Sequence, residues 1–123
     1  MPRTTSQPAP LAGRVNDPPL LILTSLASGK KHGYALMQDI AGFAGVTLGP
    51  GTLYGAIGRL EERGLIEPVG ESDRRRPYRL TPAGSVALEA ALAELRAILD
   101  EGAARLARRP APTRVRPALG AAR

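Results

Sequence analysis

Apolar positions in the first half of the chain follow the spacing of α-helices. Pro18 and Pro19 open a nearly all-apolar run that stops at Gly29, which predicts a short helix buried on most sides. A second helix is predicted over residues 33–44, before a stop at Gly45. Its apolar stripe, spaced i, i+4 and i+7, consists of Leu36, Ile40 and Phe43.

A third helix and a hairpin follow. The helix is predicted over residues 50–63, because Pro50 suits a first helical turn and Gly64 suits a stop. Its inward stripe consists of Leu53, Ile57 and Leu60. The pattern then changes to two short strands, 65–69 and 76–80, which are joined by turn-forming residues.

A long final helix is predicted from Pro82, with Thr81 as its N-cap. It spans about 25 residues, or about 37 Å at the rise of an α-helix. Its leucines follow heptad spacing, and this leucine seam consists of Leu88, Leu92, Leu95, Leu99 and Leu106. Because so long a helix cannot bury its whole seam against a small core, we expect a homodimer interface here. Closure of a bundle within one chain is the alternative.

The order of helix, helix, helix, hairpin and long helix is that of a winged helix-turn-helix. We therefore expect a mainly α fold with a small β-hairpin and a long C-terminal dimerisation helix. Four parts are predicted: a disordered tail at 1–17, the DNA-binding domain at 18–81, the dimerisation helix at 82–107 and a disordered basic tail at 108–123.

Composition narrows the chemistry. With no Cys and only one His, the chain lacks thiolate ligands and cannot build a multi-histidine metal site by itself. It also lacks a Gly-rich phosphate loop with its lysine, so we expect neither catalysis nor a cofactor. No apolar run approaches the roughly 20 residues that span a bilayer, so we expect a cytoplasmic protein.

The net charge of +6 invites a nucleic-acid partner, but its distribution is uneven. Residues 18–101 carry nine Lys or Arg against ten Asp or Glu, so the excess lies in the two tails. Net charge alone therefore does not indicate DNA binding, and the argument depends on where the central charges lie.

Candidate DNA contacts lie on the third helix and the hairpin. In a helix-turn-helix the second helix of the pair enters the major groove, and here that helix is 50–63. Thr52 and Arg59 are its outward polar side chains, and Arg can pair with guanine or with phosphate. Its outward glycines, Gly51, Gly55 and Gly58, allow close backbone approach. The basic run of the hairpin, expected along the DNA backbone, consists of Arg74, Arg75 and Arg76.

Two tyrosines and two lysines are further candidates. Tyr54, at the edge of the apolar stripe, either packs or offers its hydroxyl to phosphate. Tyr34 begins a helix, which favours a phosphate contact. Lys30 and Lys31 flank the start of the same helix and either face solvent or touch phosphate.

A family resemblance is carried by HGYAL at 32–36 and by the stretch GPGTLYGAIGRLEERGLIEPVGESDRRRPYRLTPAG. Over residues 19–106, the chain resembles the PadR family of bacterial transcriptional regulators. Two positions depart from the family pattern: Gly55 replaces a larger residue, often Pro, and Pro77 replaces a frequent aromatic. The resemblance implies a winged helix-turn-helix dimer joined through its C-terminal helix, of the short C-terminal branch. It also implies repression that a small molecule relieves.

We therefore expect a dimeric, sequence-specific repressor whose partner is double-stranded DNA with a palindromic operator. The alternatives are a winged-helix protein-interaction module and a nonspecific DNA-binding protein driven by its Arg-rich tails. We expect any effector to be small and aliphatic or a partner protein, or to be absent, because neither the first nor the last helix contains an aromatic residue on which a planar molecule could stack.

Overall fold

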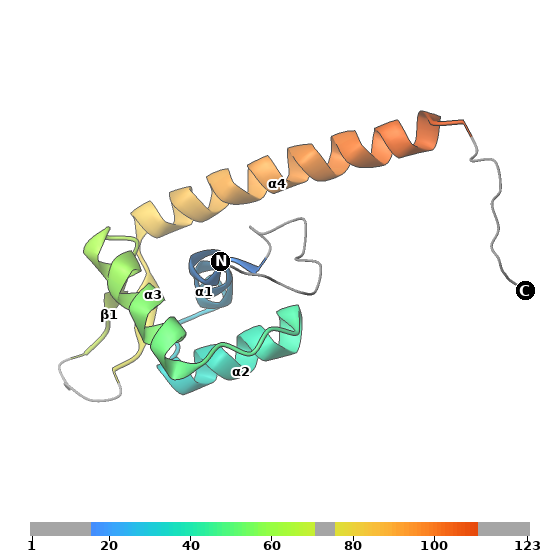
Figure 1. Ribbon diagram of the computed structural model, residues 1–123. Helices are drawn as coiled ribbons and strands as arrows, with labels where there is room; N and C mark the ends of the chain where they lie inside the picture. The colour runs from blue at the N-terminus through green and yellow to red at the C-terminus, as the bar shows by residue number, and fades with distance from the viewer. Residues whose placement is uncertain (1–15, 71–75, 111–123) are drawn as a thin grey trace, which may run out of the picture. The chain divides into compact units, whose positions relative to one another are not determined.

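The computed structural model describes residues 16–70 and 76–110. Its elements are α1 (Pro18–Leu26), α2 (Gly33–Ala44), α3 (Pro50–Glu62), β1 (Ile66–Pro68), β2 (Tyr78–Leu80) and α4 (Pro82–Arg108), shown in Figure 1. The predicted fold, mainly α with a small β-hairpin, is confirmed. The chain divides after Leu92 into two compact units, Met1–Leu92 and Ala93–Arg123. Most of both predicted tails lies outside the described residues.

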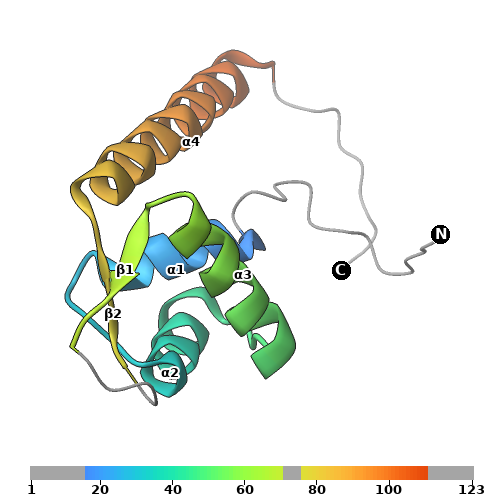
Figure 2. The ribbon, with the colours of Figure 1, turned by 90° about the vertical axis from the view of Figure 1, so that its left-hand side faces the viewer.

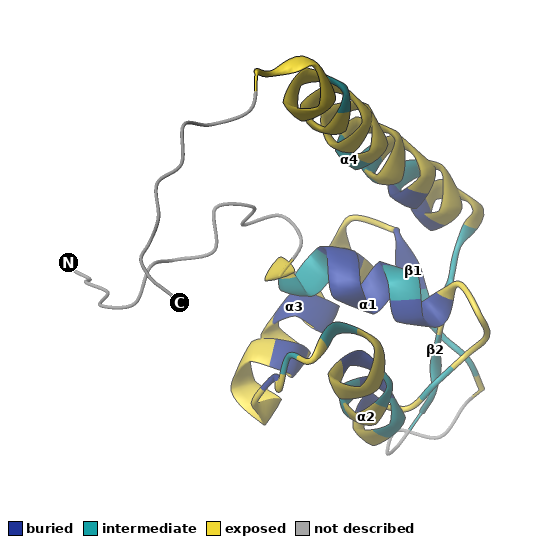
Figure 3. Cartoon of the chain, turned by 90° about the vertical axis from the view of Figure 1, so that its right-hand side faces the viewer, coloured by how far each residue is buried: buried dark blue, intermediate teal, exposed yellow. Residues whose placement is uncertain are grey.

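The core of the first unit is built around α1, which is buried along most of its length (Figure 3). The predicted stripe of α3 is confirmed, since Leu53, Ile57 and Leu60 are all buried. On α2, Leu36 and Ile40 are fully buried, whereas Phe43, the third residue of the predicted apolar stripe, is 48% exposed. The buried face of α2 ends at Ile40, and Phe43 belongs to the final turn of the helix.

The hairpin is a two-stranded antiparallel sheet whose strands lie beside α1 and α3 (Figure 2). Its register pairs Ile66 with Leu80 and Glu67 with Arg79. Lys31, just before α2, forms an isolated antiparallel bridge with Tyr78 of β2: its N–H donates to the Tyr78 carbonyl at 3.0 Å and its carbonyl accepts from the Tyr78 N–H at 2.9 Å. Backbone hydrogen bonds therefore tie the hairpin to the connection between α1 and α2.

The start of α4 is fastened to the end of α3. The Thr81 hydroxyl accepts from the Gly84 N–H at 3.0 Å, which confirms the predicted N-cap, and donates to the Gly64 carbonyl at 2.7 Å. The Thr81 N–H donates to the Leu65 carbonyl at 3.1 Å. Gly84 is buried, and a β-carbon there would lie 3.0 Å from the Leu65 carbonyl carbon and 3.1 Å from Leu80 Cδ1. The first turn of α4 thus packs directly on the backbone, which only glycine allows.

We expect Gly84→Ala to lower the free energy of unfolding by about 1–3 kcal/mol, because the new methyl group collides with backbone that cannot move cheaply. Gly42→Ala is the matched control, since Gly42 is also helical and a β-carbon there meets nothing within 4 Å. The control should gain up to about 1 kcal/mol from its better helix propensity. Urea unfolding of both variants measures the difference, and a Gly84→Ala protein as stable as the control would contradict the packing.

Candidate nucleic-acid interface

The outward face of α3 combines glycines with two polar side chains. Thr52 and Arg59 are both exposed, as are Gly51, Gly55 and Gly58. A β-carbon at Gly51 or Gly58 would meet no atom of the described residues within 4 Å. One at Gly55 would meet only Arg59 Nη1, at 3.7 Å, so the guanidinium lies back along the helix over Gly55. Packing within the described residues therefore requires none of these glycines, although glycine in a helix interior costs about 1 kcal/mol relative to alanine.

Two tyrosines lie at the first turn of α2, one on that turn and one on α3. Tyr34 is 65% exposed, and its hydroxyl oxygen accepts a hydrogen bond from Gln38 Nε2 at 3.2 Å. Tyr54 is 51% exposed, and the tip of its ring reaches across from α3 to contact Gly33. The structure thus gives Tyr54 a packing contact while leaving about half of the side chain exposed.

Among the described residues of the hairpin, one arginine is paired with an acidic residue. Arg79 Nε lies 2.7 Å from Glu67 Oε2, directly across the strand pair. This exposed ion pair neutralises one arginine of the hairpin. Arg76 is partly exposed beside β2. The other two candidates, Arg74 and Arg75, lie outside the described residues.

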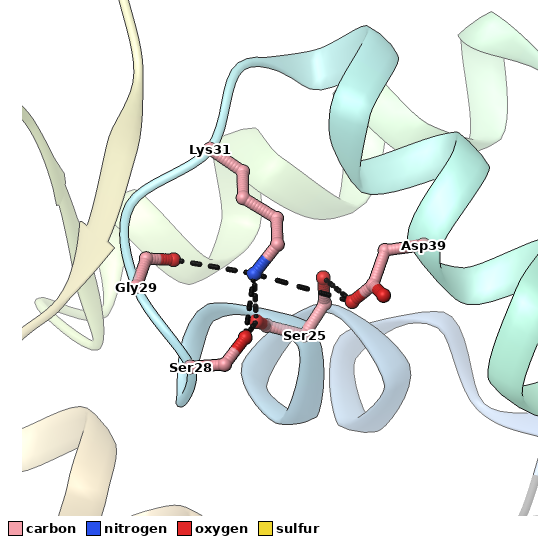
Figure 4. A network of polar contacts seen from close by, with 5 residues as sticks. All are labelled: Ser25, Ser28, Gly29, Lys31 and Asp39. Carbon is pink, nitrogen blue, oxygen red and sulfur yellow. Dashed lines mark hydrogen bonds and ion pairs between the residues drawn. The ribbon is translucent and has the colours of Figure 1, made fainter.

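Lys31 is held in a polar network between α1 and α2, which Figure 4 shows. Its ammonium donates to the carbonyl of Ser25 and to Ser28 Oγ at 2.8 Å, and it lies 4.0 Å from Asp39 Oδ2. The Ser25 hydroxyl, which is buried, donates to the same Asp39 oxygen at 2.6 Å. The ammonium therefore satisfies carbonyls at the C-terminal end of α1, where a positive charge is favoured. Lys30, in contrast, is exposed.

The leucine seam of α4 divides into buried and exposed positions. Leu88 is only 6% exposed and belongs to the chain's own core, so it offers little surface to a partner. Leu95 is partly exposed, and the remaining positions, Leu92, Leu99 and Leu106, are exposed. Ile98 is also exposed and widens this apolar face. No helix among the described residues is long and apolar enough to cross a membrane.

Comparison with known proteins decides the family. The profile of the PadR-like family of transcriptional regulators matches residues 22–90, which is more than half of the chain. The chain belongs to the PadR-like family.

Relatives of this PadR-like chain include Transcriptional regulator Rv3488 of Mycobacterium tuberculosis, 41% identical over 85 residues that cover 67% of this chain and 75% of the relative. An uncharacterized 37.1 kDa protein in transposon TN4556 of Streptomyces fradiae is 50% identical over 76 residues, 62% of this chain. The match spans only 22% of that protein's length. Among solved structures, a PadR family transcription regulator from Clostridium difficile R20291 superposes with a TM-score of 0.64 at 26% identity, covering 72% of this chain and 97% of the other.

Sequence reasoning missed one exposed residue, Ile98, and one buried residue, Gly33, of this PadR-like chain. Ile98 stands three positions after Leu95, so counting a second heptad row would have found it. Gly33 gives no such signal, because the need for a glycine there depends on a side chain from another helix.

We expect Lys31→Met to lower the free energy of unfolding by about 1–3 kcal/mol, because it leaves the Ser25 carbonyl and Asp39 without their charged partner. Lys30→Met is the control, since it removes the same charge from an exposed neighbour and should change stability by less than about 0.5 kcal/mol. Urea unfolding compares the two variants. Equal small losses would show that the Lys31 contacts contribute no stability.

Proposed function

We propose that this PadR-like regulator binds double-stranded DNA as a homodimer and acts as a sequence-specific repressor. The observation that carries the proposal is the two-sided character of α3. Its inner face is fully buried, while its outer face presents Thr52, Arg59 and three glycines that no internal contact requires. A DNA partner would place the protein in the cytoplasm.

The exposed glycines suit a helix that lies deep in the major groove. Without side chains at Gly55 and Gly58, the backbone of α3 can approach base edges and phosphates closely. Arg59 is then the side chain that reads a base, since its guanidinium can form two hydrogen bonds to guanine. Thr52, near the start of α3, contacts a base edge or an adjacent phosphate.

Phosphate contacts flank this helix on two sides. The exposure of Tyr34 at the start of α2 supports a hydrogen bond from its hydroxyl to the DNA backbone. On the hairpin side, the contacts come from Arg74, Arg75 and Arg76. Phosphate contacts fix the orientation of the protein on the duplex, while α3 supplies the sequence preference.

The apolar face of α4 is the dimer interface in this proposal. Leu92, Leu99 and Leu106 recur at heptad spacing and are exposed in the single chain. A second copy of the same helix offers the same face, which is the requirement of a two-fold symmetric contact. Two copies of α3 then read an inverted repeat, so the operator is palindromic. Any small-molecule effector is aliphatic in this proposal, because neither α1 nor α4 carries an aromatic ring on which a planar molecule could stack.

Gly55→Ala tests the close approach of α3 to DNA. The substitution should leave the fold intact and raise its stability slightly, because the new methyl group meets only the Arg59 side chain. It should nevertheless weaken binding to an operator duplex about tenfold, or about 1.4 kcal/mol. Gly42→Ala, on α2, should stabilise the protein equally and bind as the wild type does. Fluorescence anisotropy with DNA from just upstream of the coding region measures the affinity of both variants. An unchanged affinity for Gly55→Ala would argue against insertion of α3 in the major groove.

Leu99→Glu tests the dimer. Leu99 is 65% exposed in the single chain, so a charge there leaves the fold intact but would be buried in the paired interface. Light scattering should give twice 12.9 kDa for the wild type and 12.9 kDa for the variant at micromolar concentration. Val86→Glu is the control: Val86 is equally exposed on α4 but lies off the seam, so this variant should stay dimeric. A monomeric wild type would overturn the assignment.

A further inference from the structure

Gly33 stands where its own backbone does not demand a glycine. It is the first residue of α2 and is not among the glycines with positive φ, so any residue could adopt its conformation. The space beside it is filled instead: a β-carbon at Gly33 would collide with the Tyr54 hydroxyl and would lie 2.7 Å from Cζ and 3.1 Å from Cε1 of the same ring. The glycine is therefore needed for the tyrosine of another helix.

The contact between Gly33 and Tyr54 holds α3 at a point far from its covalent connection to α2. The turn that joins the two helices starts at the C-terminal end of α2, after Ala44, whereas Gly33 is at the N-terminal end. A helix of this length separates the two points by about 17 Å. The turn itself contains Gly45, with φ of 69°, and ends at Gly49, the N-cap of α3. The direction of α3 therefore depends on its packing, which consists of its buried face against α1 and, against the start of α2, the Tyr54–Gly33 contact.

Tyr54 also lies among the residues that face DNA in the proposed function. It is in the first half of α3, two residues after Thr52 and next to Gly55. A change in its packing therefore alters the position of the segment that enters the groove. A misplacement of about 1 Å is enough to weaken directional hydrogen bonds to base edges.

We propose that Tyr54 is a positioning residue for the recognition helix α3. Its ring, seated on Gly33, fixes the angle of α3 against α2, and this contact sets the discrimination between operator and random DNA. The proposal rests on the proposed function, because it assigns a role in DNA reading. It differs from a direct phosphate contact of the Tyr54 hydroxyl, which would strengthen binding to every sequence equally.

The experiment is a double-mutant cycle on Gly33→Ala, Tyr54→Ala and the double variant, with binding measured on an operator duplex and on random DNA over a range of salt concentrations. Gly33→Ala should still fold, because the Tyr54 ring is the end of a side chain and can swing away. Each single variant should lose about tenfold in operator affinity and less than about twofold on random DNA, with the salt slope unchanged. The double variant should be no weaker than Tyr54→Ala alone, because both substitutions remove one contact.

Two further variants complete the test. Tyr54→Phe keeps the ring and should stay within about threefold of the wild type, and Gly42→Ala should bind as the wild type does. Additive losses in the cycle would overturn the proposal. So would equal losses on operator and random DNA with a salt slope lowered by about one unit, which indicate a lost phosphate contact. A wild type without preference for the operator would instead overturn the proposed function, and this inference with it. In that case, the coupling between Gly33→Ala and Tyr54→Ala in urea unfolding would still report the contact itself.

Discussion

Burial of α1 is the interaction on which the rest of the first compact unit depends. Six of its nine residues are buried, and five of these are Leu or Ile. Each fully buried side chain of this kind contributes about 1.5–3 kcal/mol, so no arrangement that exposes α1 can compete. The other elements must surround it: α2, α3 and β2 all pack against it. Because α3 covers α1 with one face only, its other face is left free for a partner.

Polar contacts around this core set the positions of the functional parts. The backbone of Lys31 forms hydrogen bonds with the hairpin, and its ammonium donates to a carbonyl at the end of α1. One residue therefore links the hairpin to the buried helix. Thr81 and Gly84 fasten the start of α4 to the end of α3 in the same way. The helix α3, the hairpin and the start of α4 thus share one scaffold.

The sequence predicted the elements well because local rules determine them. Gly45 and Gly64 have the positive φ angles expected of residues that stop helices, and Thr81 caps α4 through its side chain. Phe43 shares the spacing of the stripe but is exposed. Periodicity defines a stripe but not where the opposing surface ends. The role of Lys31 and the pairing of Arg79 with Glu67 depend on which segments meet in space. Spacing along one chain does not report such contacts.

The central claim is that two chains present two copies of α3 to one inverted repeat. Selection of bound duplexes from a random DNA library at physiological salt tests it most directly, with the number of chains per duplex measured on the enriched sequence. We expect an inverted repeat whose half-sites lie about one helical turn, or about 34 Å, apart, bound by two chains. Enrichment of no sequence, or of a single half-site bound by one chain, would contradict the claim.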